Sequence, residues 1–164
     1  TAFLTKKSIF DKIGGFEEKF FAHMEEIDYH WKCQLVGHEV WVEPSSTIYH
    51  HGGGTLSPMS PKKTYLNYRN SLILLLTNHP LGISIKLFFP RMLMELISLI
   101  REIILLRWGH GLSIIKSWIW IISNPAFILS RRKNIINKTK LNFTLHKNII
   151  LEYYIKRNKK YSNL

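Results

Sequence analysis

The chain has 164 residues, enough for one domain with a buried core, and its 46% hydrophobic content excludes wholesale disorder. Its single cysteine, Cys33, excludes an intramolecular disulfide and a zinc site built on cysteines, and fits a reducing compartment. The net charge of +12 is uneven, since residues 1–43 hold eight acidic and five basic residues whereas residues 44–164 hold three and eighteen. We therefore expect chemistry in the acidic part and an anionic partner for the basic, apolar part.

The first part of the chain predicts a strand followed by two helices. Residues 1–5 alternate in polarity, as in a strand end, and residues 6–13 suit a short helix that ends at Gly14. A second helix is predicted over residues 25–36, and its apolar positions share one face. These positions are Ile27, Trp31 and Leu35. A chain that begins inside a strand and has no signal-peptide pattern suggests a piece of a longer protein.

Two further strands and a third helix are expected before residue 80. Residues 39–42 and 47–50 have strand-like composition and flank a turn at Pro44. Pro61 stands where a helix would begin, and residues 62–77 continue with helical spacing.

From residue 81 the chain is apolar with isolated charges. Helices are expected over residues 83–108, over residues 109–123 and from Pro125 onward. The longest uncharged run after residue 81 has fourteen residues, 117–130, whereas a membrane span needs roughly 20. We therefore expect amphipathic helices that lie in the interface of an anionic bilayer, with packing on one another or on another domain as the alternative.

Three carboxylates gather at the start of the helix predicted over residues 25–36. At about 100° per residue, Glu25 and Asp28 lie roughly 60° apart, while Glu26 points roughly 160° away from Asp28. One carboxylate can therefore face a cleft as a general base while another anchors the helix. The alternative is that acids favour a first turn because of the helix dipole, which contributes a few tenths of a kcal/mol each.

A histidine pair follows the strand predicted over residues 47–50. His50 and His51 are followed directly by three glycines, which begin at Gly52. Imidazole suits a divalent metal, and glycine lets the backbone approach a phosphate closely. The pair alone does not define a metal site, because no third ligand lies nearby and no HExxH, Walker A or GxGxxG motif occurs.

The order and spacing of these pieces resemble one known family. The matching residues are Ala2, Phe3, Leu4, Ile13, Gly14, Gly15, Phe16, Glu17, Phe20, Phe21, Glu25, Glu26, Ile27, Asp28, Trp31, Lys32, Gly37, Pro44, Tyr49, His50, His51, Gly52, Gly53, Tyr68, Arg69 and Asn70. In this order they are similar to the second half of the catalytic domain of family 2 glycosyltransferases, the rhamnosyltransferase-like inverting enzymes. The resemblance implies that residues 1–80 are the acceptor-side half of a Rossmann-like GT-A domain. It implies an α/β fragment followed by a helical, amphipathic extension over residues 81–164.

The resemblance also implies a mechanism and a set of site residues. Glu26 matches the base that takes a proton from the acceptor hydroxyl, with Glu25 as the second candidate and Asp28 as a support of the helix. His50 matches a ligand of a divalent metal, Mg or Mn, that holds the leaving nucleoside diphosphate in some members. The positions implied to contact acceptor or diphosphate are Phe16, His51, Gly52, Gly53, Arg69 and Asn70.

Two departures from the family pattern limit what is expected of the isolated chain. The family needs an Asp-x-Asp metal motif, and the only aspartates here are Asp11 and Asp28. Lys32 stands where the family often has arginine, so a bidentate contact would be lost. We therefore expect a fragment that is inactive by itself.

The resemblance further implies where the longer protein works and what it binds. Its partners would be a nucleotide sugar, a glycan or lipid-linked acceptor, and an anionic membrane. It would act peripherally at the cytoplasmic face of a bacterial inner membrane, in the synthesis of cell-wall or surface polysaccharide.

Functions of a different class remain open. The chain could be a non-catalytic basic helical module that binds an anionic membrane, nucleic acid or a partner transferase, or a remnant that serves another transferase subunit. Its basic residues are interspersed with long aliphatic faces, unlike a surface that tracks phosphates, so no nucleic acid is expected as a partner.

Overall fold

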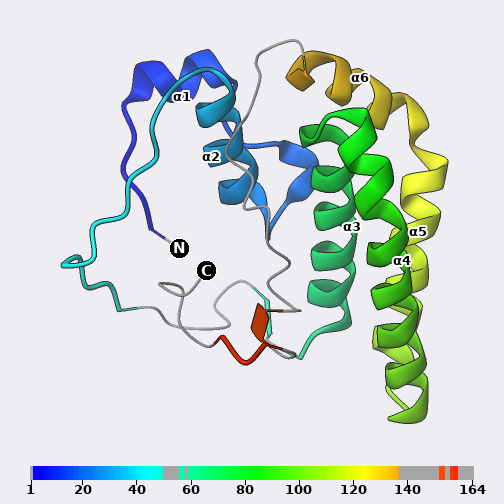
Figure 1. The fold of residues 1–164 in the computed structure, drawn as a ribbon. Helices are drawn as coiled ribbons and strands as arrows, with labels where there is room; N and C mark the ends of the chain where they lie inside the picture. The colour runs from blue at the N-terminus through cyan, green and yellow to red at the C-terminus, as the bar shows by residue number, and fades with distance from the viewer. Residues whose placement is uncertain (1, 50–55, 58, 137–151, 154–155, 159–164) are drawn as a thin grey trace.

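The computed structural model describes residues 2–49, 56–57, 59–136, 152–153 and 156–158. In chain order its elements are α1 (Lys7–Ile13), the 3-10 helix η1 (Glu18–Phe20), α2 (Glu25–Leu35), α3 (Pro61–Asn78), α4 (Leu81–Ile104), α5 (Trp108–Ser123) and α6 (Pro125–Ile136) (Figure 1). No strand occurs in these described ranges. The prediction of an α/β, Rossmann-like GT-A fragment is therefore wrong, because the described fold is all-helical.

The segments predicted as strands form extended loops. Trp41 and Val42 are 82% and 84% exposed, and Tyr49 is 96% exposed. A strand is stable only when a neighbouring strand takes up its backbone N–H and C=O groups, and no described segment pairs with this one. Local composition favoured a strand here, but the partner that a strand requires is absent from the described residues. Residue 50 lies outside those residues.

The helix predictions are confirmed to within a few residues, because local signals set the ends. The first helix ends at Gly14, whose φ of +89° is a left-handed cap conformation. α3 begins at Pro61, and the Ser60 Oγ accepts a hydrogen bond from the Lys63 backbone N–H at 3.1 Å. Pro125 begins α6 in the same way. α4 ends earlier than expected, at Ile104.

α3 is the central helix of the fold. It packs against α2, α4, α5 and α6 (Figure 1). The core joins Phe20 of η1 to Ile73 and Leu74 of α3, and side chains of α5 and α6 close it from the other side. These closing residues are Trp120, Ile121, Phe127 and Ile128. Helices beyond residue 80 therefore complete the core that holds η1, and η1 lies just before the acidic first turn of α2.

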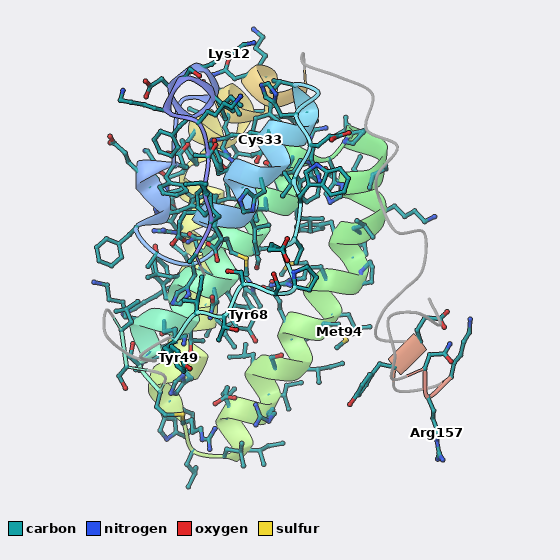
Figure 2. All side chains as sticks on the ribbon, turned by 90° about the vertical axis from the view of Figure 1, so that its left-hand side faces the viewer. Lys12, Cys33, Tyr49, Tyr68, Met94 and Arg157 are labelled. Atoms are coloured by element: carbon teal, nitrogen blue, oxygen red, sulfur yellow. The ribbon has the colours of Figure 1, made fainter. Side chains whose placement is uncertain are left out.

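Helix α4 turns its apolar side outward and its polar side inward. The outward apolar side chains in the second half of α4, each more than 40% exposed, recur at helical spacing and include Met94 (Figure 2). They are Leu93, Met94, Leu96, Ile97, Ile100, Ile103 and Ile104, which we call the outer apolar face. On the opposite side Glu95 is 2% and Glu102 9% exposed. This polarity is the reverse of that in a surface helix of a globular protein.

The described helices were also compared with the length and composition of membrane spans. No single one of them is both long and apolar enough to cross a bilayer. Residues Trp108–Ser123 and Pro125–Ile135 meet the requirement only when taken together, and they are bent by 73° at the break between them.

Candidate functional site

The turn that leads into α2 has a strained backbone. Phe21, His23 and Met24 have φ values of 63°, 68° and 72°, a region that residues other than glycine rarely adopt. Each such conformation costs on the order of 1–3 kcal/mol and persists only where surrounding contacts enforce it. We call residues 21–24 the strained turn. Because the strained turn lies directly before Glu25 and Glu26, the start of α2 is a candidate functional site.

Asn70 of α3 enforces this conformation. Its side-chain amide nitrogen donates to the carbonyl oxygens of Phe20, Ala22 and His23 at 3.0, 2.9 and 2.7 Å. The Arg69 Nε donates to the Asn70 Oδ1 at 2.9 Å, so the amide presents its nitrogen to the turn. Asn70 is 0% exposed. A single buried amide therefore holds two carbonyls of the strained turn and that of Phe20, directly before it, in one place.

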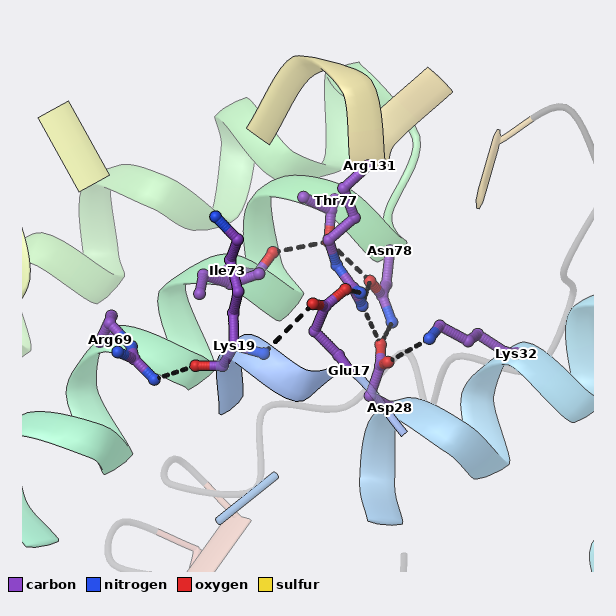
Figure 3. Close-up of polar contacts among 9 residues, drawn as sticks. All are labelled: Glu17, Lys19, Asp28, Lys32, Arg69, Ile73, Thr77, Asn78 and Arg131. Carbon is purple, nitrogen blue, oxygen red and sulfur yellow. Dashed lines mark hydrogen bonds and ion pairs between the residues drawn. The ribbon is translucent and has the colours of Figure 1, made fainter. Parts of the chain in front are cut away.

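Arg69 supports the same segment from beside Asn70. Its Nη2 donates to the carbonyl oxygens of Lys19 and Phe20, at 2.5 and 3.2 Å (Figure 3). The guanidinium lies 5.1 Å from the Trp120 ring and 8% of the residue is exposed. The sequence predicted that Arg69 and Asn70 contact acceptor or diphosphate. In the structure the Asn70 amide and the Arg69 Nη2 donate to backbone carbonyls before α2. The Arg69 Nε and Nη1 donate to the Asn70 Oδ1 and the Tyr65 hydroxyl.

Glu25 and Glu26 occupy the first turn of α2. Both residues are half-buried, and the Glu25 Oε2 is a buried atom without a hydrogen-bond partner among the described residues. The Nε2 of His23, in the strained turn, is buried and without such a partner in the same part of the chain. Buried polar atoms are usually paired, so these two atoms leave hydrogen-bonding capacity at the helix start.

Asp28 lies inside the protein and not on a cleft. It is 0% exposed, and its Oδ2 lies 2.8 Å from the Lys32 Nζ (Figure 3). Its Oδ1 accepts from the Asn78 Nδ2 at 2.9 Å and from the Arg131 Nη2. A carboxylate enclosed in this way anchors α2 and does not meet a substrate. Of the three candidate carboxylates, only Glu25 and Glu26 are thus partly exposed.

The remaining predicted site residues lie elsewhere or outside the described residues. Phe16 packs edge-on against Phe10 and Tyr29, with ring centroids 5.4 and 5.8 Å apart, and is 41% exposed. This aromatic cluster lies against the middle of α2. The predicted ligands and phosphate contacts that fall outside the described residues are His50, His51, Gly52 and Gly53.

The described residues do not contain the set of donor side chains that the predicted metal site requires. These residues contain no group of three His, Cys, Asp or Glu side chains arranged to hold a metal ion. The predicted ligand His50 falls outside them. The described residues thus do not form a metal centre.

Arg131 is a site residue that the sequence analysis did not single out. It is the first of three consecutive basic residues, 131–133, for which the sequence predicted no individual role. Its signal is local, because the residues four before and four after it, Phe127 and Ile135, are both apolar. Both pack inward, Ile135 with 6% exposure, so an arginine between them on the same helical face points inward too.

The chain was compared with protein-family models, with curated proteins and with solved structures, and none of them matches it. The site therefore defines the chain only as a helical protein that presents two carboxylates on a strained helix start.

Proposed function

We propose that the start of α2 supplies the base of an inverting glycosyltransferase that works at a membrane surface. The observation that carries the proposal is the strained turn, held by Asn70, which presents Glu25 and Glu26. Three unfavourable backbone conformations directly before two carboxylates are typical of functional sites. The resemblance over residues 1–80 supports the reaction class.

In this mechanism a carboxylate at the helix start accepts the proton of the acceptor hydroxyl. The hydroxyl oxygen then forms a bond to the anomeric carbon of the nucleotide sugar, and the bond to the nucleoside diphosphate breaks with inversion. Glu26 is the first candidate for the base and Glu25 the second. Asp28 is excluded from this role because it is buried between Lys32 and Arg131. It keeps the helix start in place instead.

The test uses the product of the complete natural gene. It is incubated with a panel of radiolabelled nucleotide sugars and with membrane lipid extract as acceptor. Loss of a general base typically lowers the rate by roughly 10²–10⁴-fold, so Glu26→Gln should lower kcat by that factor. Glu18→Gln is the matched control, since Glu18 is an exposed acid on the neighbouring η1. Full activity in both Glu26→Gln and Glu25→Gln would contradict the assignment.

The outer apolar face supports the membrane part of the proposal. Exposed apolar patches larger than a few hundred Å² mark interaction sites, and here the face covers the second half of α4. Exposed basic residues lie before, within and after this face along the chain, and they are Lys86, Arg101 and Arg107. Trp108, 58% exposed, is the first residue of α5. Apolar side chains bordered by cations and tryptophan are typical of helices that lie in an anionic bilayer surface.

Vesicle co-sedimentation tests this surface directly. The chain is mixed with phosphatidylcholine vesicles with or without phosphatidylserine. Replacing Ile97 and Ile100 together by Glu should abolish binding to both, because a charged residue then enters the acyl region. Lys86→Gln should lower binding only to the anionic vesicles, by roughly fivefold, since a basic residue near such a surface contributes about 1 kcal/mol. Equal binding to both vesicle types would contradict the anionic preference.

The same face favours a second candidate function, a non-catalytic module that binds an anionic membrane. The two candidates make different forecasts for the assays above. Vesicle binding without sugar transfer by the complete gene product would favour the module, whereas transfer that depends on Glu26 would favour the enzyme.

A further inference from the structure

A single arginine on α6 joins both ends of the segment that carries the site. The Arg131 Nη1 lies 2.9 Å from the Glu17 Oε2, and its Nη2 pairs with the Asp28 Oδ1. Its Nε donates to the Thr77 Oγ1 at 3.1 Å, which ties the same group to the end of α3 (Figure 3). Arg131 is 6% exposed, and its guanidinium lies 5.2 Å from the centre of the Phe20 ring.

The segment between these two carboxylates carries both candidate bases and the strained turn before them. Residues 17–28 include η1, the strained turn and the first turn of α2 with both candidate bases. Asn70 and Arg69 hold the middle of this segment through its carbonyls, whereas Arg131 holds its two ends. A guanidinium is planar and rigid, so it fixes the separation and orientation of the carboxylates that it bridges. A single rigid group thus fixes the ends of the segment.

We propose that Arg131 is a positioning residue for the carboxylates at the start of α2, acting through Asp28 and Glu17. The assignment rests on the proposed function of Glu25 and Glu26 and names what sets their orientation. Since α6 follows α5 after one residue, this arginine also connects the helices next to the outer apolar face with the site.

The rival explanation is an ion pair that contributes only to stability. Removing one member of a buried pair leaves an uncompensated charge and often unfolds a protein, whereas replacing both members by neutral groups is often tolerated. Asp28→Asn combined with Arg131→Met is such a replacement for the central pair, and it preserves the acceptor for the Asn78 amide. The outer partners Glu17 and Lys32 keep their charges, and their side chains are 21% and 17% exposed to solvent. This double variant therefore separates folding from positioning.

The first readout is amide hydrogen exchange on the full chain, which requires no activity. Arg131→Met and the double variant should exchange the amides of residues 22–28 about tenfold faster than the original chain, with α4 unchanged. Lys133→Met is the matched control, because Lys133 is an exposed cation on the same helix. Arg131→Lys should behave like Arg131→Met, because a flexible ammonium group does not fix the separation and orientation of two carboxylates as the planar guanidinium does.

The second readout is sugar transfer by the complete gene product. The same variants should lower kcat by about tenfold or more and leave the KM for the nucleotide sugar unchanged, because a misplaced base slows only the chemical step. A folded double variant with original exchange and original kcat would overturn the proposal and leave a plain ion pair. Should the original gene product transfer no sugar while exchange still rises, the positioning by Arg131 stands and the function proposed for the carboxylates fails.

Discussion

Replacing Asn70 by Ala removes the contacts that hold the strained turn in its conformation. The side chain donates from one amide nitrogen to three carbonyl oxygens and accepts from the Arg69 Nε. Alanine leaves these carbonyls and the guanidinium N–H without their partner in a buried place. We therefore expect the turn to relax and the protein to lose stability together.

The magnitude follows from the geometry. An amide NH2 group has only two hydrogens, so its three contacts count as about two hydrogen bonds. Their net contribution to the free energy of unfolding is about 2 kcal/mol. The unpaired buried Arg69 Nε adds about 1–2 kcal/mol. Alanine is a better helix former than asparagine by roughly 0.5 kcal/mol, which offsets a part. The free energy of unfolding should thus fall by about 3 kcal/mol.

Urea denaturation followed by circular dichroism measures this difference. Asn67→Ala is the matched control, since Asn67 lies on the same helix, forms no described hydrogen bond and changes helix propensity equally. Asn70→Asp should lose at least as much as Asn70→Ala, because an oxygen then faces three carbonyl oxygens. If Asn70→Ala and Asn67→Ala agree to within about 0.5 kcal/mol, the amide does not hold the turn and the reasoning fails.

Three further predictions concern stability. Burial lowers the pKa of His79 below its ordinary value of 6.5, so the unfolded chain binds more protons than the folded chain below about pH 6.5. The free energy of unfolding should therefore fall as the pH drops below this value. His79→Gln should flatten this pH profile in chemical denaturation. Glu95→Ala should cost about 3 kcal/mol in the same assay, because the Trp118 Nε1 loses a buried acceptor, while Glu95→Gln should cost less. Ser60→Ala should cost about 1 kcal/mol of thermal stability, because the Lys63 N–H at the start of α3 loses its cap.

The helices could be predicted because their ends are marked locally. Gly14 stops the first helix, and Pro61 and Pro125 begin two others, each through backbone rules that need no tertiary partner. The strand predictions failed for the opposite reason. Residues 39–42 have suitable composition, but a strand depends on a partner elsewhere in the chain, and composition does not report whether that partner exists.

The site was predicted in part for a related reason. The sequence indicated the first turn of α2 and Asn70, but it predicted that Asn70 contacts a ligand. The actual contacts could not be predicted, because only the fold brings the carbonyls of residues 20–23 to the Asn70 amide across 47–50 positions. Arg131 was passed over because its partners Glu17 and Asp28 lie 114 and 103 positions away. Long-range polar contacts of this kind leave no periodic trace in a sequence, whereas the apolar residues that flank them do.

Helix α4 shows why a periodic pattern is not sufficient to orient a helix. Its sequence has an apolar side and a polar side, and by pattern alone the apolar side would face the core. Glu95 accounts for the observed orientation of α4. Its carboxylate pairs with the Arg91 Nε on the same helix at 2.6 Å and accepts a hydrogen bond from the Trp118 Nε1 on α5. With those donors inside, the polar side can be buried and the outer apolar face must find its own partner. We propose a bilayer surface as this partner, in keeping with the exposed cations near the face. A variant that removes Glu95 should therefore weaken vesicle binding as well as stability, because the apolar side of α4 is then no longer held outward.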